Sequence, residues 1–114
     1  MNACIFCRII EGDAPGEIVY RDDLVTAFRD IHPVAPVHVL IVPNQHFTSL
    51  NDVKSEDEAL AGRMILVARK LAVQEGIHKS GYRLIVNTGS HGGQVIPHLH
   101  LHLIGGQRMR HPMG

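Results

Sequence analysis

Hydrophobic and polar residues alternate strictly over residues 98–103, which read His-Leu-His-Leu-His-Leu. A period of two is typical of a half-buried β-strand, so this pattern predicts three imidazoles on one face and three leucines directed into the core on the other. Histidine is an uncommon residue, and three on one face predict a surface built for chemistry rather than ordinary polar covering.

The other apolar patterns predict two helices and further strands. A short helix is expected over Cys4–Glu11, where apolar residues have helical spacing and a glycine and a proline follow. A long helix is expected to begin near Ser55, in a capping box with Glu58, and to end near Gly76. Strands are expected over residues 18–20, 25–30, 37–42, 82–87 and 99–104.

This order of elements predicts the fold class. Strands joined mostly by short turns, with one long helix, indicate an α+β domain with an antiparallel sheet of about five strands. The chain has 114 residues, so we expect one domain over residues 1–114.

Charge and hydropathy narrow the range of partners. Eleven Lys and Arg residues balance eleven Asp and Glu residues, and no basic run is present. This balance argues against nucleic acid and membrane partners and favours a small polar ligand. No segment has the roughly 20 apolar residues of a membrane span, and the N-terminus does not have the pattern of an export signal. We therefore expect a cytoplasmic protein.

The two cysteines, Cys4 and Cys7, have the spacing C-x-x-C. Two cysteines are too few for a disulfide scaffold, and in a reducing compartment this spacing indicates a metal site or a redox pair.

A glycine-rich loop over residues 87–97 leads directly into the alternating histidines. Its glycines, Gly89, Gly92 and Gly93, are expected to let backbone amides approach a ligand and form a nest for phosphate oxygens. A phosphate held there would lie over the middle imidazole, His100. Histidine nitrogen can attack phosphorus, and water can then hydrolyse the phosphoramidate that forms.

These segments resemble a known family. Residues 98–103 resemble the signature of the histidine triad (HIT) family, and residues 87–94 resemble its Asn-x-Gly-x-x-Gly-Gly-Gln segment. Residues 30–38 are similar to the family's Asp-Ile-x-Pro-x-Ala-Pro-x-His segment. The likeness runs from Cys4 to Gly114 and is strongest to the branch of nucleotide-binding proteins and purine nucleoside phosphoramidases.

The resemblance implies a HIT-like fold whose sheet continues across a homodimer. It also implies a hydrolase that binds a purine nucleotide and cleaves nucleoside phosphoramidates or related adenylates through a nucleotidyl-histidine intermediate. No cofactor is then required for the chemical step.

The resemblance further assigns roles to residues. His100 is the implied nucleophile and His102 contacts the α-phosphate, while His98 and His38 orient and support the site. The implied nucleotide-binding residues, besides His100 and His102, are Asp30 at the ribose hydroxyls, Ile31 in the base pocket, and Asn87, Gly93, Gln94 and Val95 around the phosphate and ribose. Val95 stands where this branch often has a serine that assists the departing amine, so turnover of phosphoramidates is expected to be slower or differently selective.

A metal site is implied by other relatives. In some HIT proteins and in the related galactose phosphate uridylyltransferases, an N-terminal C-x-x-C and two histidines bind zinc. The matching positions here are Cys4, Cys7, His46 and His98. Two thiolates and two imidazoles close a tetrahedral shell, so the implied Zn²⁺ is structural.

Two alternative functions remain at this stage. One is a metallohydrolase in which His98, His100 and either His102 or His38 hold a catalytic zinc, because His-x-His on a strand is also a metal-binding pattern. The other is a nucleotide-binding module without activity. Metal removal would abolish the chemistry of the first, and the second would bind adenosine monophosphate without turnover.

Overall fold

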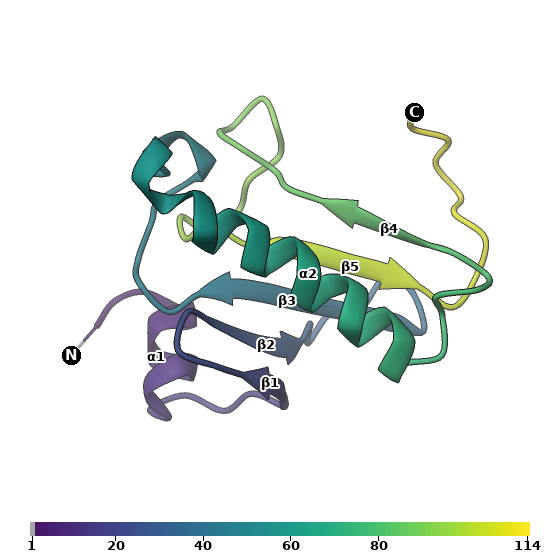
Figure 1. Cartoon of the computed structure of the whole chain (residues 1–114), viewed down its shortest axis with the longest axis horizontal. Helices are drawn as coiled ribbons and strands as arrows, with labels where there is room; N and C mark the ends of the chain where they lie inside the picture. The colour runs from purple at the N-terminus through teal and green to yellow at the C-terminus, as the bar shows by residue number, and fades with distance from the viewer. Residues whose placement is uncertain (1) are drawn as a thin grey trace.

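Five antiparallel strands form one sheet in the order β1-β2-β3-β5-β4. The computed structural model describes residues 2–114, and Figure 1 shows the long helix lying across one face of the sheet. The elements are α1 (Ile5–Glu11), β1 (Ile18–Arg21), β2 (Val25–Arg29), β3 (Val37–Pro43), η1 (Leu50–Asp52), η2 (Ser55–Asp57), α2 (Glu58–Gln74), β4 (Tyr82–Ile85) and β5 (Leu101–Gly105). The predicted α+β class, the antiparallel sheet and the two helices are confirmed.

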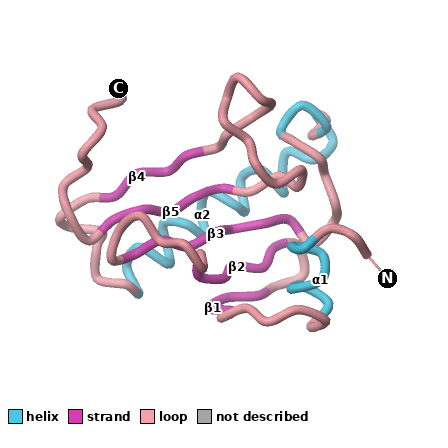
Figure 2. Tube along the Cα trace, turned by 180° about the vertical axis from the view of Figure 1, so that it is seen from behind, coloured by secondary structure: helices cyan, strands magenta, loops and turns pink. Residues whose placement is uncertain are grey.

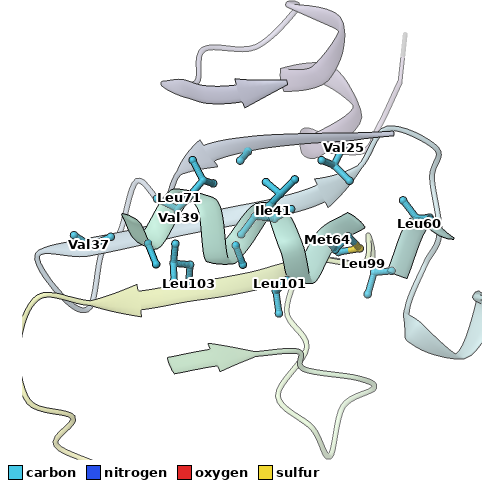
Figure 3. Packing of buried hydrophobic residues seen from close by; sticks show 14 of the residues in the cluster. Val25, Val37, Val39, Ile41, Leu60, Met64, Leu71, Leu99, Leu101 and Leu103 are labelled. Carbon is cyan, nitrogen blue, oxygen red and sulfur yellow. The ribbon is translucent and has the colours of Figure 1, made fainter. Parts of the chain in front are cut away.

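The larger part of the core lies between α2 and the sheet. The helix buries Met64 and Leu71 against residues such as Ile41, Leu101 and Leu103 of the sheet (Figure 3). Apolar residues at helical spacing on α2 thus meet apolar residues at alternate positions on the strands. Within residues 2–114, no helix is both long enough and apolar enough to cross a membrane.

A second apolar cluster occupies the opposite face of the sheet, beneath α1. Phe6 and Ile9 of α1 pack with Phe28 of β2 and with Leu40 and Val42 of β3. Figure 2, seen from behind, shows α1 on the side away from α2. Because the three leucines of residues 98–103 all belong to the core beneath α2, the alternating histidines are directed to the α1 side.

The last strand is shorter than its alternation predicts. β5 begins at Leu101, which pairs with Ile41 of β3, so the expectation of a strand from residue 99, or from the first alternating histidine, is wrong. The Leu99 N–H instead donates to the Phe47 carbonyl at 2.7 Å, and the His98 N–H donates to the Ile96 carbonyl at 2.8 Å. These bonds to loop carbonyls take the place of a continued ladder with β3.

The predicted capping box of α2 is also wrong. Ser55 lies in the 3₁₀ turn η2, and α2 begins at Glu58 without a side-chain cap. Asp57 closes the turn instead, because its carboxylate accepts the Lys54 N–H at 3.0 Å. The predicted end of the long helix near Gly76 is confirmed. Gly76 lies just after α2 and has φ of 72°, a conformation that glycine adopts without steric cost.

Candidate functional site

Two of the three alternating histidines, His100 and His102, line a cavity of about 920 Å³ that α1 also borders. Their ring centroids lie 5.0 Å apart. His38 of β3 and Asp30, just after β2, line the same cavity. The antiparallel pairing of β2, β3 and β5 therefore brings together polar groups that are far apart in the sequence.

Hydrogen bonds determine which nitrogen of His38 and His102 carries a proton. The Val34 N–H donates to Nδ1 of His38 at 3.2 Å, so this nitrogen is unprotonated and the proton of a neutral ring lies on Nε2. His38 Nε2 then donates to Nδ1 of His102 at 2.9 Å and lies 3.4 Å from Oδ2 of Asp30. His102 consequently carries its own proton on Nε2, which leaves that N–H available as a donor.

The hydrogen bond of His100 fixes the opposite arrangement. Its Nδ1 lies 2.7 Å from the backbone carbonyl of His98, and a carbonyl can only accept, so Nδ1 carries the proton. The lone pair of a neutral His100 is therefore on Nε2. The site thus holds a nucleophilic nitrogen on one imidazole beside a donor N–H on the next.

Burial keeps the imidazoles of His38 and His102 neutral. Desolvation, with smaller effects from the neighbouring His100 and His38, lowers the pKa of His102 from 6.5 to about 4. Desolvation also lowers the pKa of His38, and the Asp30 carboxylate opposes this only in part. Neutral rings at pH 7 are what the chain of hydrogen bonds requires.

These lowered pKa values link the stability of the fold to pH. The unfolded chain takes up a proton on His102 near the ordinary pKa of 6.5, whereas the folded chain does so only near pH 4. Between these values the unfolded state binds more protons, so the free energy of unfolding increases with pH. We expect the contribution of His102 to be complete above about pH 7 and to be lost as the pH falls from 6.5 towards 4, as measured by urea denaturation.

The variant His102→Asn is the control for this pH dependence. It removes the titrating ring, so its free energy of unfolding should decrease less over the same interval. The difference between the two curves gives the contribution of His102, together with any change that its loss causes in its hydrogen-bonded partner His38. Equal slopes in both proteins would contradict the assignment.

The glycine-rich loop is held together by its own backbone. The N–H groups of Gly92, Gly93 and Gln94 donate to loop carbonyls at 3.1–3.2 Å, and the Gly89 N–H donates to Oε1 of Gln94 at 3.0 Å. The prediction that these four backbone N–H groups are free to bind phosphate is therefore wrong, because each already has an acceptor. Gly92 is required for a different reason, since a Cβ there would lie 2.3 Å from the Thr88 carbonyl oxygen.

The side chains of Gln94 and Asn87 form hydrogen bonds that stabilise this loop. Besides accepting from Gly89, Gln94 donates through Nε2 to the carbonyls of Thr48 at 2.7 Å and Ile96 at 3.0 Å. Gln94 does not line the cavity, whereas Asn87 and Gly93 do. Asn87 Nδ2 donates to the Gly92 carbonyl at 2.7 Å, which leaves its side-chain oxygen for another partner.

Four side chains, Cys4, Cys7, His46 and His98, converge beside the cavity, and we call them the metal cluster. Nδ1 of His98 lies 3.3 Å from Sγ of Cys4, 3.6 Å from Sγ of Cys7 and 3.1 Å from Nδ1 of His46. Sγ of Cys7 lies 3.4 Å from Nδ1 of His46. The edges of a tetrahedral Zn²⁺ shell with these ligand types are roughly 3.3–3.8 Å long. Three of the four separations fall within this range, and the separation between His46 and His98 is slightly shorter, so a small rotation of these rings would fit the four residues to this ion.

The surroundings of the metal cluster also suit a metal. Nε2 of His98 lies 3.1 Å from the Pro43 carbonyl, so that nitrogen carries the proton and Nδ1 is free as a ligand, the arrangement usual for metal-binding histidines. Burial, with the neighbouring Cys4 thiol, raises the pKa of Cys7 to about 11. Zn²⁺ binding would displace this thiol proton, so metal affinity should increase with pH.

Comparison with known proteins decides the family. The model of the HIT domain matches residues 11–109. The chain belongs to the HIT family. It is 58% identical over 103 residues to the purine nucleoside phosphoramidase of Escherichia coli, covering 90% of this chain and 87% of that protein.

Solved structures of HIT proteins agree with this membership. A HIT family hydrolase from Legionella pneumophila superposes with a TM-score of 0.93 at 46% identity, covering 97% of this chain and 99% of that one. A zinc-bound histidine triad family protein from Mycobacterium smegmatis has a TM-score of 0.82 at 28% identity, covering 95% and 78% of the two chains.

In this HIT chain the three alternating histidines do not act as one group. His98 belongs to the metal cluster and does not line the cavity. His38, His102 and Asp30 form a second group of side chains whose ligand atoms lie close enough together to hold a metal ion. His100 is in neither group. A catalytic zinc shared by His98 and His100, as the metallohydrolase alternative required, does not fit this division.

One wall of the cavity is apolar and was not predicted from the sequence. Phe6, Ile9, Phe28 and Leu40, which we call the apolar wall, are buried and line it, while Ile31 is 80% exposed at its rim. The β2–β3 register makes Phe28 and Leu40 direct partners. The helical spacing of apolar residues in α1 could have indicated this wall, because that face must pack against something.

Proposed function

We propose that the protein hydrolyses purine nucleoside phosphoramidates or related adenylyl compounds through a nucleotide covalently bound to His100. The observation that carries this proposal is the pairing of a lone pair on His100 Nε2 with a donor N–H on His102 at the same cavity. The name of the E. coli relative supports the choice of substrate.

The two steps follow from these protonation states. His100 Nε2 attacks the α-phosphorus, an N–P bond forms, and the bond from phosphorus to the amine breaks as the amine takes up a proton from water. The His102 N–H stabilises the negative charge on the phosphoryl oxygens. Water then attacks the same phosphorus and gives up a proton to solvent, the bond to His100 breaks with its electron pair returning to Nε2, and the nucleoside monophosphate leaves.

The chemical character of the other cavity residues suggests which part of the nucleotide each would bind. Asp30, whose side chain is 20% exposed at the cavity, would accept hydrogen bonds from the two ribose hydroxyls. The apolar wall would contact the faces of the purine, with Ile31 at the rim. Asn87 and Gly93 would lie next to the phosphate and ribose, while Gln94 would act by holding the loop.

A covalent adduct is the direct test of this function. The protein is mixed with an adenosine phosphoramidate, quenched within milliseconds to seconds and analysed by mass spectrometry. We expect an added adenylyl group on the peptide that contains His100, together with release of adenosine monophosphate. Binding of the nucleotide without adduct or turnover would instead support the binding-module alternative.

Val95 gives a prediction about the leaving group. It lines the cavity and is 85% exposed, so a hydroxyl at this position could donate a proton to the departing amine. Because a well-placed general acid contributes about 10²–10⁴-fold, we expect Val95→Ser to accelerate hydrolysis of substrates with poor amine leaving groups by about tenfold or more. Substrates with good leaving groups should change little.

Val95→Ala is the matched control, since it removes the bulk of valine without adding a hydroxyl. Initial rates are measured for a series of amines of increasing pKa. An equal effect of Ser and Ala, or an equal effect on all amines, would mean that the proton comes from another source.

We also propose that the metal cluster holds one structural Zn²⁺. Its donor set, its spacing and the outer hydrogen bond of His98 support this. The ion would link α1 to the loop after β3 and to the segment before β5, so its role would be structural. Such thiolate sites persist in reducing compartments, which supports a cytoplasmic location.

A homodimer is proposed from the open edge of the sheet. β4 is the outer strand, and the side chain of Ile65 on α2 is half exposed. An apolar cavity of about 230 Å³ between α2 and the start of β5 adds Leu50 and Val86 to this surface. A second copy of the chain would cover these groups and extend the sheet.

The oligomeric state tests this surface. We expect a dimer by sedimentation velocity at micromolar concentration, and we expect Ile65→Glu together with Val86→Glu to give a monomer, because two charges would be buried at the interface. Ile18→Glu on β1, at the opposite edge of the sheet, should remain a dimer. A wild-type monomer, or an unaffected dimer in the double variant, would contradict the proposal.

The chain is further proposed to form a single HIT domain over residues 1–114. The family match over residues 11–109 supports this, and Met1 lies outside the described residues.

A further inference from the structure

His98 connects the metal cluster to His100 through its main chain. Its ring is fully buried, with Nδ1 among the cluster ligands and Nε2 bonded to the Pro43 carbonyl. Its own carbonyl accepts the Nδ1–H of His100 at 2.7 Å. Whatever holds the ring of His98 therefore also holds the acceptor that orients His100.

Phe6 makes a second connection between the same two sites. It lies in the sequence between Cys4 and Cys7 and is 6% exposed. Its ring meets the ring of His98 edge-on at a centroid distance of 5.7 Å and the ring of His100 at 5.2 Å. Edge-to-face packing of this kind favours one orientation of each ring.

We propose that Phe6 is a positioning residue for His100 and that, together with the His98 carbonyl, it couples metal binding at the metal cluster to the reactivity of the nucleophile. This inference rests on the proposed function of His100. It assigns to the metal a role beyond stability, because a bound ion would fix the first turn of α1 and the ring of His98. Phe6 in that turn contacts the ring of His100, and His98 supplies the carbonyl that accepts from it.

The expected cost of losing this coupling is large although no reacting group is removed. A displacement of a reacting group by about 1 Å can reduce a rate about 10²-fold. Without the metal, or without the Phe6 ring, His100 would be free to rotate and to exchange its proton between the two nitrogens. We expect adenylylation of His100 to become about 10- to 100-fold slower.

The test compares zinc-loaded wild type with Phe6→Leu and Phe28→Leu, each confirmed to be folded and to contain zinc. Phe28 belongs to the same apolar wall and packs on Phe6 at 5.3 Å, so Phe28→Leu controls for a changed base pocket. Single-turnover adenylylation with an adenosine phosphoramidate gives the rate of the chemical step. Titration with adenosine monophosphate gives the binding change separately.

A second readout does not depend on activity. Two-bond ¹H–¹⁵N correlations of the imidazoles, recorded at one pH, report which nitrogen of His100 carries the proton. We expect a single Nδ1–H form in zinc-loaded wild type and in Phe28→Leu. Phe6→Leu, and wild type after chelation at a temperature where it stays folded, should show a mixture of both forms.

The outcomes separate the coupling from the proposed function. A zinc-loaded Phe6→Leu protein with the wild-type tautomer and the wild-type rate of adenylylation overturns the coupling. If wild type forms no adenylyl adduct, the proposed function fails, and the tautomer measurement still decides whether Phe6 and the metal orient His100. A rate loss in Phe28→Leu equal to that in Phe6→Leu, with no tautomer change in either, would reduce Phe6 to part of the base pocket.

Discussion

Replacing His100 with Asn is expected to reduce turnover by roughly 10⁴-fold or more while leaving nucleotide binding largely intact, as is found when a covalent nucleophile is removed. The reason is geometric. His102 points a donor N–H towards the cavity rather than a lone pair, and the lone pair on His38 Nδ1 is occupied by the Val34 N–H. A neighbouring imidazole therefore cannot take over attack on phosphorus without reorganising the whole hydrogen-bond chain.

The measurement combines steady-state rates with calorimetric titration of adenosine monophosphate. His91→Asn is a matched control, because His91 is exposed in the glycine-rich loop and does not line the cavity. It should retain wild-type rates. Near-normal activity of His100→Asn would refute the assignment of the nucleophile and, with it, the proposed two-step reaction.

Loss of the metal cluster is expected to have the largest effect on stability. Cys4→Ser combined with Cys7→Ser removes both thiolates, so the protein should contain no zinc and should melt at least about 10 °C lower, since several kcal/mol of metal binding is linked to folding. Some activity should remain at low temperature, because His100 and His102 are still present. The remaining rate should be lower than that of wild type if the coupling through Phe6 and His98 holds.

Elemental analysis of protein prepared without chelator gives the zinc content, and differential scanning calorimetry gives the melting temperature. Wild type stripped of metal should melt at the same temperature as the double variant, since both have lost the same ion. Absence of zinc in wild type would remove the site. Complete loss of activity with unchanged folding would instead move the metal into the chemistry.

Short sequence patterns predicted the direction of several side chains and part of the metal cluster. The alternation over residues 98–103 correctly separated leucines for the core from imidazoles for the opposite face, because side-chain direction along an extended chain depends only on sequence parity. The spacing of Cys4 and Cys7 indicated a metal site or a redox pair, and the resemblance to zinc-binding relatives added His46 and His98. The structure brings ligand atoms of these four residues within 4.8 Å of one another. The strand ends and the cap of α2 were less predictable, since they depend on which partner competes for a few backbone groups.

The sequence by itself determined the fold class, the family and the residue types available for chemistry, because these follow from periodicity and from motifs only a few residues long. Only the tertiary structure decided how those residues are used. It brings His38 within hydrogen-bond distance of His102, 64 positions away. It also bonds Gln94 to Gly89, Ile96 and Thr48, and it places His98 in the metal cluster rather than at the cavity. The physical reason is that each donor and acceptor has several possible partners, and only the packing of distant strands and loops selects among them.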